Sequence, residues 1–413
     1  MPQIENKTYR KKRKMLMGSR TSKKVCLLST YPPRKCGIAV FTKNLVDAMD
    51  LYCDSVSSTL IALNENSTSC HYDERVDWQI RHDNEEDYIK VAEEVNSSDI
   101  DVVNIQHEFG IFGGEWGDHI LSFLETLRKP VVTTLHTLQP DFDPEGLRVL
   151  KQIISRSNAI VVISNVAIGI LAQLGISFEK INVIPHGCPN IPFIPSDYIK
   201  PSLGLKNRTV LCTFGLISRG KGIEYAIQAL RPIVAKHPEV IYLIVGETHP
   251  VVKRNEGEKY RRMLLEQVRE LGLENHVLFQ NRFLSKMELI RYLQATDIYI
   301  TPYPGMNQIS SGTLINALAA GRAVVSTPYL HAKEVLNNGR GILCDFKNSA
   351  SIADAVESLL SNQSLKREVE TKAYEYSRSF IWSRVAKKYA ELFNLISGHK
   401  VEEYPVEVAA REA

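Results

Sequence analysis

The sequence predicts an α/β protein of two domains, each built on a parallel sheet with helices on both faces. Its 413 residues exceed what one hydrophobic core usually holds. Short apolar segments alternate with amphipathic ones along most of the chain, which is typical of parallel sheets covered on both faces. Four prolines within residues 189–201 interrupt this alternation and indicate a linker between the two halves.

The first half opens with a strand, a loop and a helix. An apolar segment at residues 25–29 predicts a buried strand, a turn-rich loop follows at 31–37, and an amphipathic helix is expected at 38–49. The loop does not read G-x-G-x-x-G, so the dinucleotide-binding fingerprint is absent. The other elements predicted for this half are a helix at 85–95 and strands at 57–63, 102–107, 130–136, 159–164 and 181–187.

Three histidines, His107, His136 and His186, come at the carboxyl ends of predicted strands, and Glu108 follows the first of them. Open α/β sheets bind ligands at this edge, so the group favours a site, although a single histidine there is more often structural. No spacing typical of a metal centre occurs. Of the two D-x-D triplets, residues 99–101 lead into a strand, whereas residues 141–143 lie in a strand-end loop that could meet a substrate.

The second half begins with a predicted strand at 209–215, a glycine-rich loop at 216–222 and a helix at 222–234. Arg219 and Lys221 in that loop suit phosphate binding, because phosphates often bind where a strand leads into a helix. The remaining predicted strands are 241–246, 277–280, 298–303, 323–327 and 341–346, and the remaining helices are 256–271, 352–360, 365–376 and 385–396.

Residues 302–321 are the segment around which we interpret the chain. A small polar turn, residues 310–313, follows an apolar strand and opens a helix that is expected to reach about Ala320. Ser311, Gly312 and Thr313 suit a loop and a helix cap. The start of a helix offers free backbone N–H groups and a partial positive charge, and small residues let an anion approach. We interpret this turn as a diphosphate-binding site; the alternative is an ordinary capped helix.

The amino-terminal segment is strongly basic. Residues 1–24 contain nine Lys or Arg residues and one acid, although the net charge of the whole chain is only +3. We expect a disordered, solvated tail, with weak association to anionic lipid head groups through residues 7–24 as the alternative. Nucleic acid is not expected, because no aromatic residues or motifs accompany the charge. The polar residues 399–413 are expected to fray.

Several features favour a cytoplasmic protein, with a peripheral position at the inner membrane face as the alternative. The seven cysteines are scattered without a C-x-x-C pair, which favours reduced thiols. No apolar run reaches the length needed to span a membrane. The amino end lacks the apolar segment of a secretory signal.

Taken in order, several motifs along residues 25–397 resemble glycosyltransferase family 4, whose members have the GT-B architecture. Residues 215–222 resemble the family's G-R-L-x-x-x-K-G, residues 245–250 its V-G-x-G-P, residues 296–302 its A-D-x-x-x-x-P and residues 316–321 its E-A-M-A-C-G. Residues 135–137 resemble the strand end that carries the family's histidine, and residues 184–187 the turn that closes the first domain. Each motif is weak alone, but the ordered set is specific.

The resemblance implies two Rossmann-like domains that face a cleft. Residues 25–195 would present the acceptor, residues 196–380 would bind a nucleotide-sugar donor, and a helix at 381–398 would cross back to the first domain. The implied reaction retains the anomeric configuration and needs neither a metal nor another cofactor. The implied partners are a nucleotide-sugar and a carbohydrate or lipid-linked acceptor.

The patterns and the resemblance together assign three groups of site residues. The predicted catalytic residues are His136, Lys221 and Arg219. The predicted donor-binding residues are Gly215, Glu247, His249, Gln308, Ser310, Ser311, Gly312, Thr313 and Asn316. The predicted acceptor-side residues are Gly37, His107 and Glu108. The base is expected to lie near residues 280–283.

The chain departs from the family's motifs at three positions. The two acids of the E-x7-E motif are replaced by Gln308 and Asn316, and the arginine of G-R-L by Leu216. An amide both donates and accepts hydrogen bonds, but a neutral bond contributes about 1 kcal/mol against about 1.5–3 for a charged one. We therefore expect donor recognition to be weakened or redirected, and Arg219 to supply the cation that Leu216 cannot.

The expected reaction is transfer of a hexosyl group, with mannosyl or glucosyl guessed from the resemblance. The residues offer no convincing pair of carboxylates for a double displacement, so the leaving phosphate is expected to help deprotonate the acceptor. Two alternatives remain. One is a retaining phosphorylase that uses inorganic phosphate at the same anion site, and the other is a non-catalytic sugar-nucleotide-binding protein.

Overall fold

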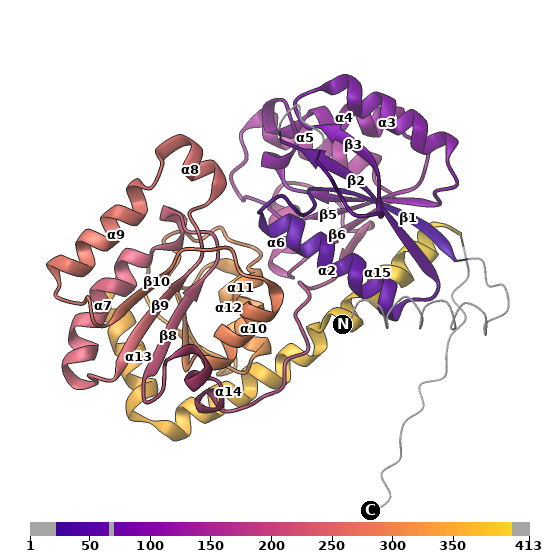
Figure 1. Cartoon of the computed structure of the whole chain (residues 1–413). Coiled ribbons are helices and arrows are strands. Elements are labelled where there is room, and N and C mark those ends of the chain that lie inside the picture. Colours follow the sequence, from indigo (N-terminus) through magenta and orange to yellow (C-terminus); the bar gives the residue numbers. More distant parts are fainter. Residues whose placement is uncertain (1–21, 66–69, 399–413) are drawn as a thin grey trace, which may run out of the picture.

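The computed structural model describes residues 22–65 and 70–398, which form two lobes around two parallel sheets (Figure 1). Most of the predicted basic tail, residues 1–21, and all of the polar tail, residues 399–413, lie outside the described residues. In the described part of the chain, every helix is too short or too polar to span a lipid bilayer.

The first lobe contains a seven-stranded sheet in the order β3-β2-β1-β4-β5-β6-β7, and all neighbouring strands are parallel. The strand order changes direction between β1 and β4, so the loops after these strands lie where such sheets bind ligands. The strands are β1 (Lys23–Ser29), β2 (Val56–Asn64), β3 (Val76–Arg81), β4 (Val102–His107), β5 (Val131–Leu135), β6 (Ala159–Val162) and β7 (Ile181–Val183). The helices are α2 (Gly37–Tyr52), α3 (Glu85–Ser97), α4 (His119–Thr126), α5 (Pro144–Arg156) and α6 (Val166–Gln173), with short 3-10 turns η1 (Phe109–Ile111) and η2 (Glu115–Gly117).

The second lobe contains a six-stranded sheet in the order β10-β9-β8-β11-β12-β13, which is also parallel throughout. Its direction changes between β8 and β11. The strands are β8 (Thr209–Phe214), β9 (Val240–Val245), β10 (Val277–Gln280), β11 (Ile298–Thr301), β12 (Ala323–Ser326) and β13 (Ile342–Leu343). The helices are α7 (Ile223–Lys236), α8 (Pro250–Glu256), α9 (Lys259–Glu270), α10 (Lys286–Ala295), α11 (Gly312–Ala319), α12 (Leu330–Leu336), α13 (Ser349–Ser361), α14 (Gln363–Ser377) and α15 (Trp382–Ile396), with 3-10 turns η3 (Ser196–Tyr198), η4 (Lys200–Leu203), η5 (Arg219–Lys221) and η6 (Arg378–Phe380).

Several elements differ from the sequence-based expectation: α4, α5, α6, α10, α12 and the edge strand β3 were not predicted. In β3 half-buried and exposed residues alternate and only Ile80 is fully buried, so its sequence contains no apolar run. The predicted helix at 256–271 is two helices, α8 and α9. They are separated at Gly257, which has a φ of +63° and so lies in the left-handed region that favours glycine.

The first strand begins earlier than predicted. Lys23 and Lys24, assigned to the basic tail, belong to β1 and pair with Val56 and Ser57 of β2. The Lys23 ammonium lies 3.1 Å from a carboxylate oxygen of Asp101, which also accepts a 2.8 Å hydrogen bond from the Lys24 backbone N–H. These contacts extend the strand into residues that are too polar to be recognised as part of it.

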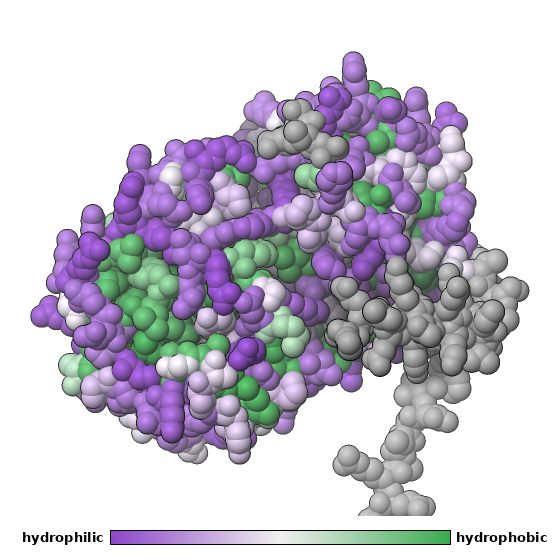
Figure 2. Space-filling model, in the orientation of Figure 1, coloured by the Kyte–Doolittle hydropathy of each residue, from purple (hydrophilic) through white to green (hydrophobic). Residues whose placement is uncertain are grey.

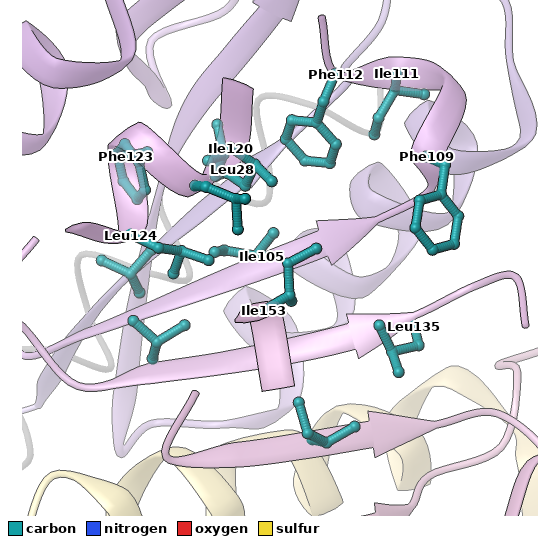
Figure 3. Close-up of a cluster of buried hydrophobic side chains, with 14 of the residues drawn as sticks. Leu28, Ile105, Phe109, Ile111, Phe112, Ile120, Phe123, Leu124, Leu135 and Ile153 are labelled. Atoms are coloured by element: carbon teal, nitrogen blue, oxygen red, sulfur yellow. The ribbon is translucent and has the colours of Figure 1, made fainter. Parts of the chain in front are cut away.

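Helices cover both faces of the first sheet. On one face α3, α4 and α5 enclose a core that includes Leu28, Ile105 and Phe123 (Figure 3). On the other face α2 packs beside α15 around a second core, in which Val385 and Phe393 of α15 are buried.

The last helix returns to the first lobe after the second sheet is complete. α15 runs back along the underside of the molecule to lie beside α2, as predicted (Figure 1). Tyr389 of α15 is 3.1 Å from the Thr134 hydroxyl of β5. On the face drawn in Figure 2 the surface is mostly hydrophilic, and apolar residues gather on the lobe of the second sheet.

Candidate active site

The two lobes contact each other through residues that follow the carboxyl ends of their strands. Lys35, in the loop after β1, lies 3.0 Å from Glu247, which follows β9. Glu65, after β2, lies 2.8 Å from Arg254 of α8. A further contact joins the Ser164 hydroxyl, after β6, to the Ile309 carbonyl at 3.0 Å. These contacts therefore bring the loops at the carboxyl ends of the two sheets together.

The start of α11 lies at this junction. Ser311 is the N-cap, and its hydroxyl accepts a hydrogen bond from the Leu314 N–H. Its own N–H donates to Nδ1 of His331 at 3.0 Å. Ile309, only 2% exposed, belongs to the core of the first lobe, although it comes from the second. Contact between the lobes therefore fixes the turn that precedes α11.

Gly312 is required by a close neighbour from the first lobe. A Cβ at this position would lie 2.6 Å from Nε2 of His186, closer than real contacts allow. The imidazole has little room to move, because it packs against Phe41 at 5.0 Å and Trp382 at 5.8 Å between ring centroids.

We expect Gly312→Ala to lower the melting temperature and to reduce the affinity of any ligand that binds at the start of α11. The reason is that overpacking costs about 1–3 kcal/mol. Gly305→Ala is the matched control, since a Cβ there meets no atom within 4 Å. Thermal unfolding of both variants checks this. Equal melting temperatures for the two would contradict the proposed crowding at Gly312.

Lys221 lies beside the same turn. Its ammonium donates a 2.7 Å hydrogen bond to the Tyr303 hydroxyl, which lies 3.1 Å from the Thr313 hydroxyl. The Thr313 hydroxyl is in turn 3.2 Å from that of Ser311. A Cβ on Gly215 would lie 3.3 Å from Thr313 and 3.5 Å from the ammonium. The structure thus brings the predicted cation and the predicted turn together.

Tyr303 was not predicted as a site residue. It follows the end of β11, where an aromatic side chain suggests only core packing, and it is 6% exposed. Burial opposes its ionisation, but the nearby Lys221 ammonium and several hydrogen bonds lower its pKa. Tyr303 therefore holds Lys221 in place through a polarised hydroxyl.

Two glycines explain how the loops of the second lobe come so close. Gly222, at a φ of +61°, has the Pro302 carbonyl oxygen 2.1 Å from the position of a Cβ. Gly246, at a φ of +145°, has the Gly215 carbonyl oxygen 1.9 Å from the position that a Cβ would take. No larger residue fits at either point, so the loops after β8, β9 and β11 form one compact surface around Lys221.

His136 lies on the side of the first lobe. Its Nε2 is 2.8 Å from the Gln106 side-chain oxygen, and the Gln106 amide donates to Asn104. Nε2 therefore carries the proton, which leaves the lone pair on Nδ1. Burial, and then the neighbouring histidines His186 and His107, lower the pKa of His136 to about 3, so the ring is neutral.

The ring of Phe41 joins His136 to His186. It is in edge contact with His136 at 4.7 Å and with His186 at 5.0 Å between centroids. The Nδ1–H of His186 donates to the Gly187 carbonyl at 2.8 Å, so Nε2 faces Gly312 with its lone pair. Burial lowers the pKa of His186 to about 4. His136 and the start of α11 are thus separated by one aromatic ring and one imidazole.

Gln106 and Asn104 were also missed. Their signal was present, because polar residues at alternate positions of an otherwise apolar strand are unusual. Both are fully buried and hydrogen-bonded, so they form a network that fixes the tautomer of His136.

The prediction that His107 lies on the acceptor side is not supported by its position. Successive side chains of a strand point to opposite faces, so His107 points away from the Gln106 and His136 side. It is fully buried between Phe109, in edge contact at 4.7 Å, and Phe112, stacked at 5.4 Å. Neither ring nitrogen has a hydrogen-bond partner among the described residues. Burial lowers its pKa to about 3.

Glu108, the next residue, contacts the residue that follows His136. Its carboxylate accepts a hydrogen bond from the Thr137 hydroxyl, in the loop that begins after His136. Burial raises the pKa of this carboxyl, although the hydrogen bonds from Thr137 and Gly110 oppose the shift. Gly37, the third predicted acceptor-side residue, is the first residue of α2, where a Cβ would meet open space.

Arg219 does not join Lys221. Its guanidinium lies 3.7 Å from Glu256 and 5.5 Å from the centre of the Tyr260 ring, and the side chain is 61% exposed. The physical reason is the 3-10 turn η5, in which residues two apart point in different directions. The expectation that Arg219 replaces the cation missing at Leu216 is therefore not supported by the geometry.

The other predicted donor-binding residues surround the site at different distances from its centre. Glu247 is paired with Lys35, and His249 caps α8 by accepting from the Val251 N–H at 3.3 Å. Burial and then Lys221 lower the pKa of His249. The remaining predicted residues stay on the turn and the helix: Gln308, exposed, donates to the Ser310 carbonyl, and Asn316 is half-buried in α11.

Within the described residues, no group of three or more His, Cys, Asp or Glu side chains is arranged to hold a metal ion. The arrangement that does occur pairs a helix start and an ammonium in the second lobe with a neutral imidazole in the first. Such an arrangement can bind a phosphorylated group and a neutral polar group side by side.

Two family models match the chain. The model for glycosyl transferases group 1 matches residues 196–376, and that for glycosyltransferase family 4 matches residues 79–189. An uncharacterized glycosyltransferase of Methanocaldococcus jannaschii is 27% identical over 251 residues, 59% of this chain and 60% of that protein. A phosphatidyl-myo-inositol mannosyltransferase of Mycolicibacterium smegmatis is 26% identical over 279 residues, 67% of each chain. The first three relatives are matched over 60%, 51% and 60% of their own length.

Solved structures match over more of the chain. HepE of Anabaena, crystallised with UDP, covers 90% of this chain and 100% of its own, with a TM-score of 0.73 and 19% identity. Sucrose-phosphate synthase of Thermosynechococcus elongatus covers 91% of this chain and 99% of its own, with a TM-score of 0.75 and 16% identity. At these identities the likeness concerns the fold, and both lobes take part in it.

Proposed function

The chain belongs to glycosyltransferase family 4 and has the GT-B fold, and from this premise we propose that it moves a hexosyl group from a nucleotide-diphosphate sugar to a sugar or lipid-linked acceptor. The transferred sugar would keep its anomeric configuration, and no metal would be required. A mannosyl or glucosyl donor is the first choice, and the mannosyltransferase of Mycolicibacterium smegmatis supports mannosyl.

The observation that carries the proposal is the convergence of Lys221, Tyr303 and Thr313 at the start of α11. A diphosphate placed there would meet backbone N–H groups, the Thr313 hydroxyl and an ammonium, all of which stabilise the charge that develops as it leaves. The UDP complex of HepE, a protein of the same fold, supports a nucleotide ligand for this chain.

In the proposed reaction the acceptor oxygen bonds to the anomeric carbon while the bond from that carbon to the diphosphate oxygen breaks. The acceptor proton passes to the leaving phosphate oxygen, which Lys221 stabilises. His136, which is neutral, would accept a hydrogen bond at Nδ1 from a hydroxyl of the transferred sugar and so orient it. Contact between the lobes would exclude water and favour transfer over hydrolysis.

The amides at Gln308 and Asn316 would contact the sugar and the nucleotide in place of two acids. Both lie on the turn and helix that Ile309 anchors to the first lobe. Because neutral amides bind hydroxyls less strongly than carboxylates, we propose a weaker or altered donor preference.

A thermal-shift panel of UDP-, GDP- and ADP-sugars tests the proposal, because a ligand that binds only the folded protein raises its melting temperature. Turnover with the stabilising donor, followed by NMR of the product's anomeric proton, tests retention. Release of sugar 1-phosphate that depends on inorganic phosphate would instead identify a phosphorylase. Donor binding without turnover over a broad acceptor panel would indicate a binding protein.

We expect Tyr303→Phe to lower kcat/KM about tenfold, because the Lys221 ammonium loses one charge-assisted hydrogen bond of about 1.5 kcal/mol. Tyr329→Phe is the matched control. Its ring stacks on Tyr303 at 4.9 Å and its hydroxyl is buried, but that hydroxyl is bonded to Thr301 and not to Lys221. Steady-state kinetics with the identified donor check this. Equal losses of kcat/KM in the two variants would show that Tyr303 contributes only to core packing.

A further inference from the structure

The loop between β1 and α2 places an arginine of the first lobe against the second. The Arg34 N–H donates to the Tyr31 carbonyl at 3.1 Å, and the Arg34 carbonyl accepts from the Cys36 N–H at 3.2 Å. The loop backbone is therefore tied into a tight turn. The Lys35 ammonium, one residue on, is 3.0 Å from Glu247 of the second lobe.

The Arg34 guanidinium is half-buried and poorly paired. Its side chain is only 17% exposed, and the acid nearest to it, Glu65, is 3.9 Å from Nη2. That carboxylate is already held by Arg254 at 2.8 Å. Nη1 is buried and has no hydrogen-bond partner among the described residues. A buried donor left without an acceptor costs about 1–3 kcal/mol. The simplest reason to retain such a donor is that a ligand supplies the acceptor.

Contacts of the neighbouring residue bring the loop that carries Arg34 close to the loops around Lys221. Lys35 reaches Glu247, which directly follows Gly246. A Cβ on Gly246 would lie 1.9 Å from the Gly215 carbonyl oxygen, and a Cβ on Gly215 would lie 3.5 Å from the Lys221 ammonium. Both cations are close enough to His249 to act on it: after burial, Lys221 lowers its pKa, Glu65 raises it and Arg34 lowers it.

We propose that Arg34 binds the phosphates of the nucleotide donor from the first lobe, opposite Lys221. This inference rests on the proposed function. A diphosphate carries more negative charge than one ammonium balances, and Arg219 points away from the site. A guanidinium presents two parallel N–H groups to phosphate oxygens, and Nη1 and Nη2 of Arg34 have that capacity.

The inference gives the contact between the lobes a role in donor binding. A donor held by Lys221 on one side and Arg34 on the other joins the two lobes through its phosphates. Glu65 contacts both Arg34 of the first lobe and Arg254 of the second, at 3.9 and 2.8 Å. Arg34 thus acts as a substrate-binding residue that only the closed arrangement of the lobes brings into place.

The test is calorimetric titration of the full chain with UDP, GDP and ADP, and with the matching monophosphates. For the diphosphate that binds wild type, Arg34→Gln is expected to weaken affinity at least tenfold, the loss typical of one charge-assisted contact of about 1.5–3 kcal/mol. Monophosphate affinity should fall less. Arg34→Lys should recover part of the loss, because an ammonium keeps the charge but not the paired geometry.

Arg254→Gln is the matched control. It removes a cation with the shorter contact to the same Glu65, but one whose side chain is 57% exposed, and it should change diphosphate affinity less than threefold. Equal losses for Arg34→Gln and Arg254→Gln would overturn the inference, because general charge or lobe contact would then explain both. So would an Arg34→Gln affinity within threefold of wild type.

The outcomes separate this inference from the proposed function. Wild-type binding of a diphosphate that is insensitive to Arg34 overturns the inference and leaves the proposed function standing. Failure of wild type to bind any of the three diphosphates rejects both. The melting temperature of each variant without nucleotide shows whether it is folded. If Arg34→Gln does not fold, the diphosphate affinity of Arg34→Lys provides the test. An unchanged affinity in Arg34→Lys would contradict phosphate binding by two parallel N–H groups.

Discussion

Replacing Lys221 with alanine is expected to lower kcat about 10²- to 10³-fold, the loss typical when one preorganised donor to a developing negative charge is removed. The ammonium is held by the Tyr303 hydroxyl at 2.7 Å, beside the start of α11. Negative charge grows on the diphosphate as its bond to the sugar breaks, so the effect should fall mainly on kcat and less on KM. Steady-state kinetics with the donor identified by thermal shift measure both.

Two further variants sharpen this result. Lys221→Arg should retain part of the activity, because it keeps the charge but not the compact geometry that fits against Tyr303. Arg219→Ala should change kcat less than threefold, because that guanidinium is paired with Glu256 at the surface. If Arg219→Ala proves as damaging as Lys221→Ala, the phosphate site is built differently from the arrangement described.

Features that depend on local pattern could be predicted from the sequence. Ser311 and Gly312 follow an apolar strand, and this order is enough to predict a helix start after a turn. Lys221 lies in a glycine-rich junction between a strand and a helix, which is enough to predict a phosphate contact. The alternation of strands and helices likewise predicted two parallel sheets, because each element carries its own signal.

Features that depend on side-chain direction could not be predicted. Arg219 and Lys221 are two residues apart, and only the 3-10 turn decides that one faces Tyr303 and the other Glu256. His107 and His136 end neighbouring strands, but the face of each strand decides which ring enters the core. A motif gives the residue type and its place on the chain, whereas packing sets where the side chain points.

Contacts between the lobes were also outside the reach of the sequence. Lys35 and Glu247 are 212 residues apart, and nothing near either residue indicates the other. Arg34 stands in a loop that reads as an ordinary turn, and its importance appears only when its buried Nη1 is seen to lack a partner in the part of the chain that the structure describes. The replacement at Leu216 suggested that a cation was missing, but not that the first lobe could supply one.

Mild acid is expected to destabilise the protein by several kcal/mol, because three buried histidines are held neutral. Burial lowers the pKa of His107, His136 and His331 to about 3 each, with smaller contributions from neighbouring histidines for the last two. Unfolded histidine has a pKa of about 6.5, so as pH falls below that value the unfolded chain takes up protons that the folded chain does not.

The stability that the neutral histidines contribute is fully present above pH 6.5 and is lost toward pH 3, at about 1.4 kcal/mol per histidine for each pH unit. At pH 5 three histidines would cost about 6 kcal/mol, which is comparable to the whole stability of many proteins. Burial raises the pKa of Glu108, which acts in the opposite sense but through one group only.

His107 offers the clearest test of this loss, because it contacts two phenylalanines and lies away from Lys221. His107→Phe should remove about a quarter of the pH dependence of the unfolding free energy between pH 6.5 and pH 5, measured by urea denaturation, because His186, whose pKa burial lowers to about 4, contributes together with the three deeper histidines. Phe112→Leu, which alters packing on the same imidazole without changing a titratable group, should lower stability equally at every pH. A wild-type slope in His107→Phe would mean that the buried ring accepts a proton in the folded protein, which requires a partner that neither Phe109 nor Phe112 can provide.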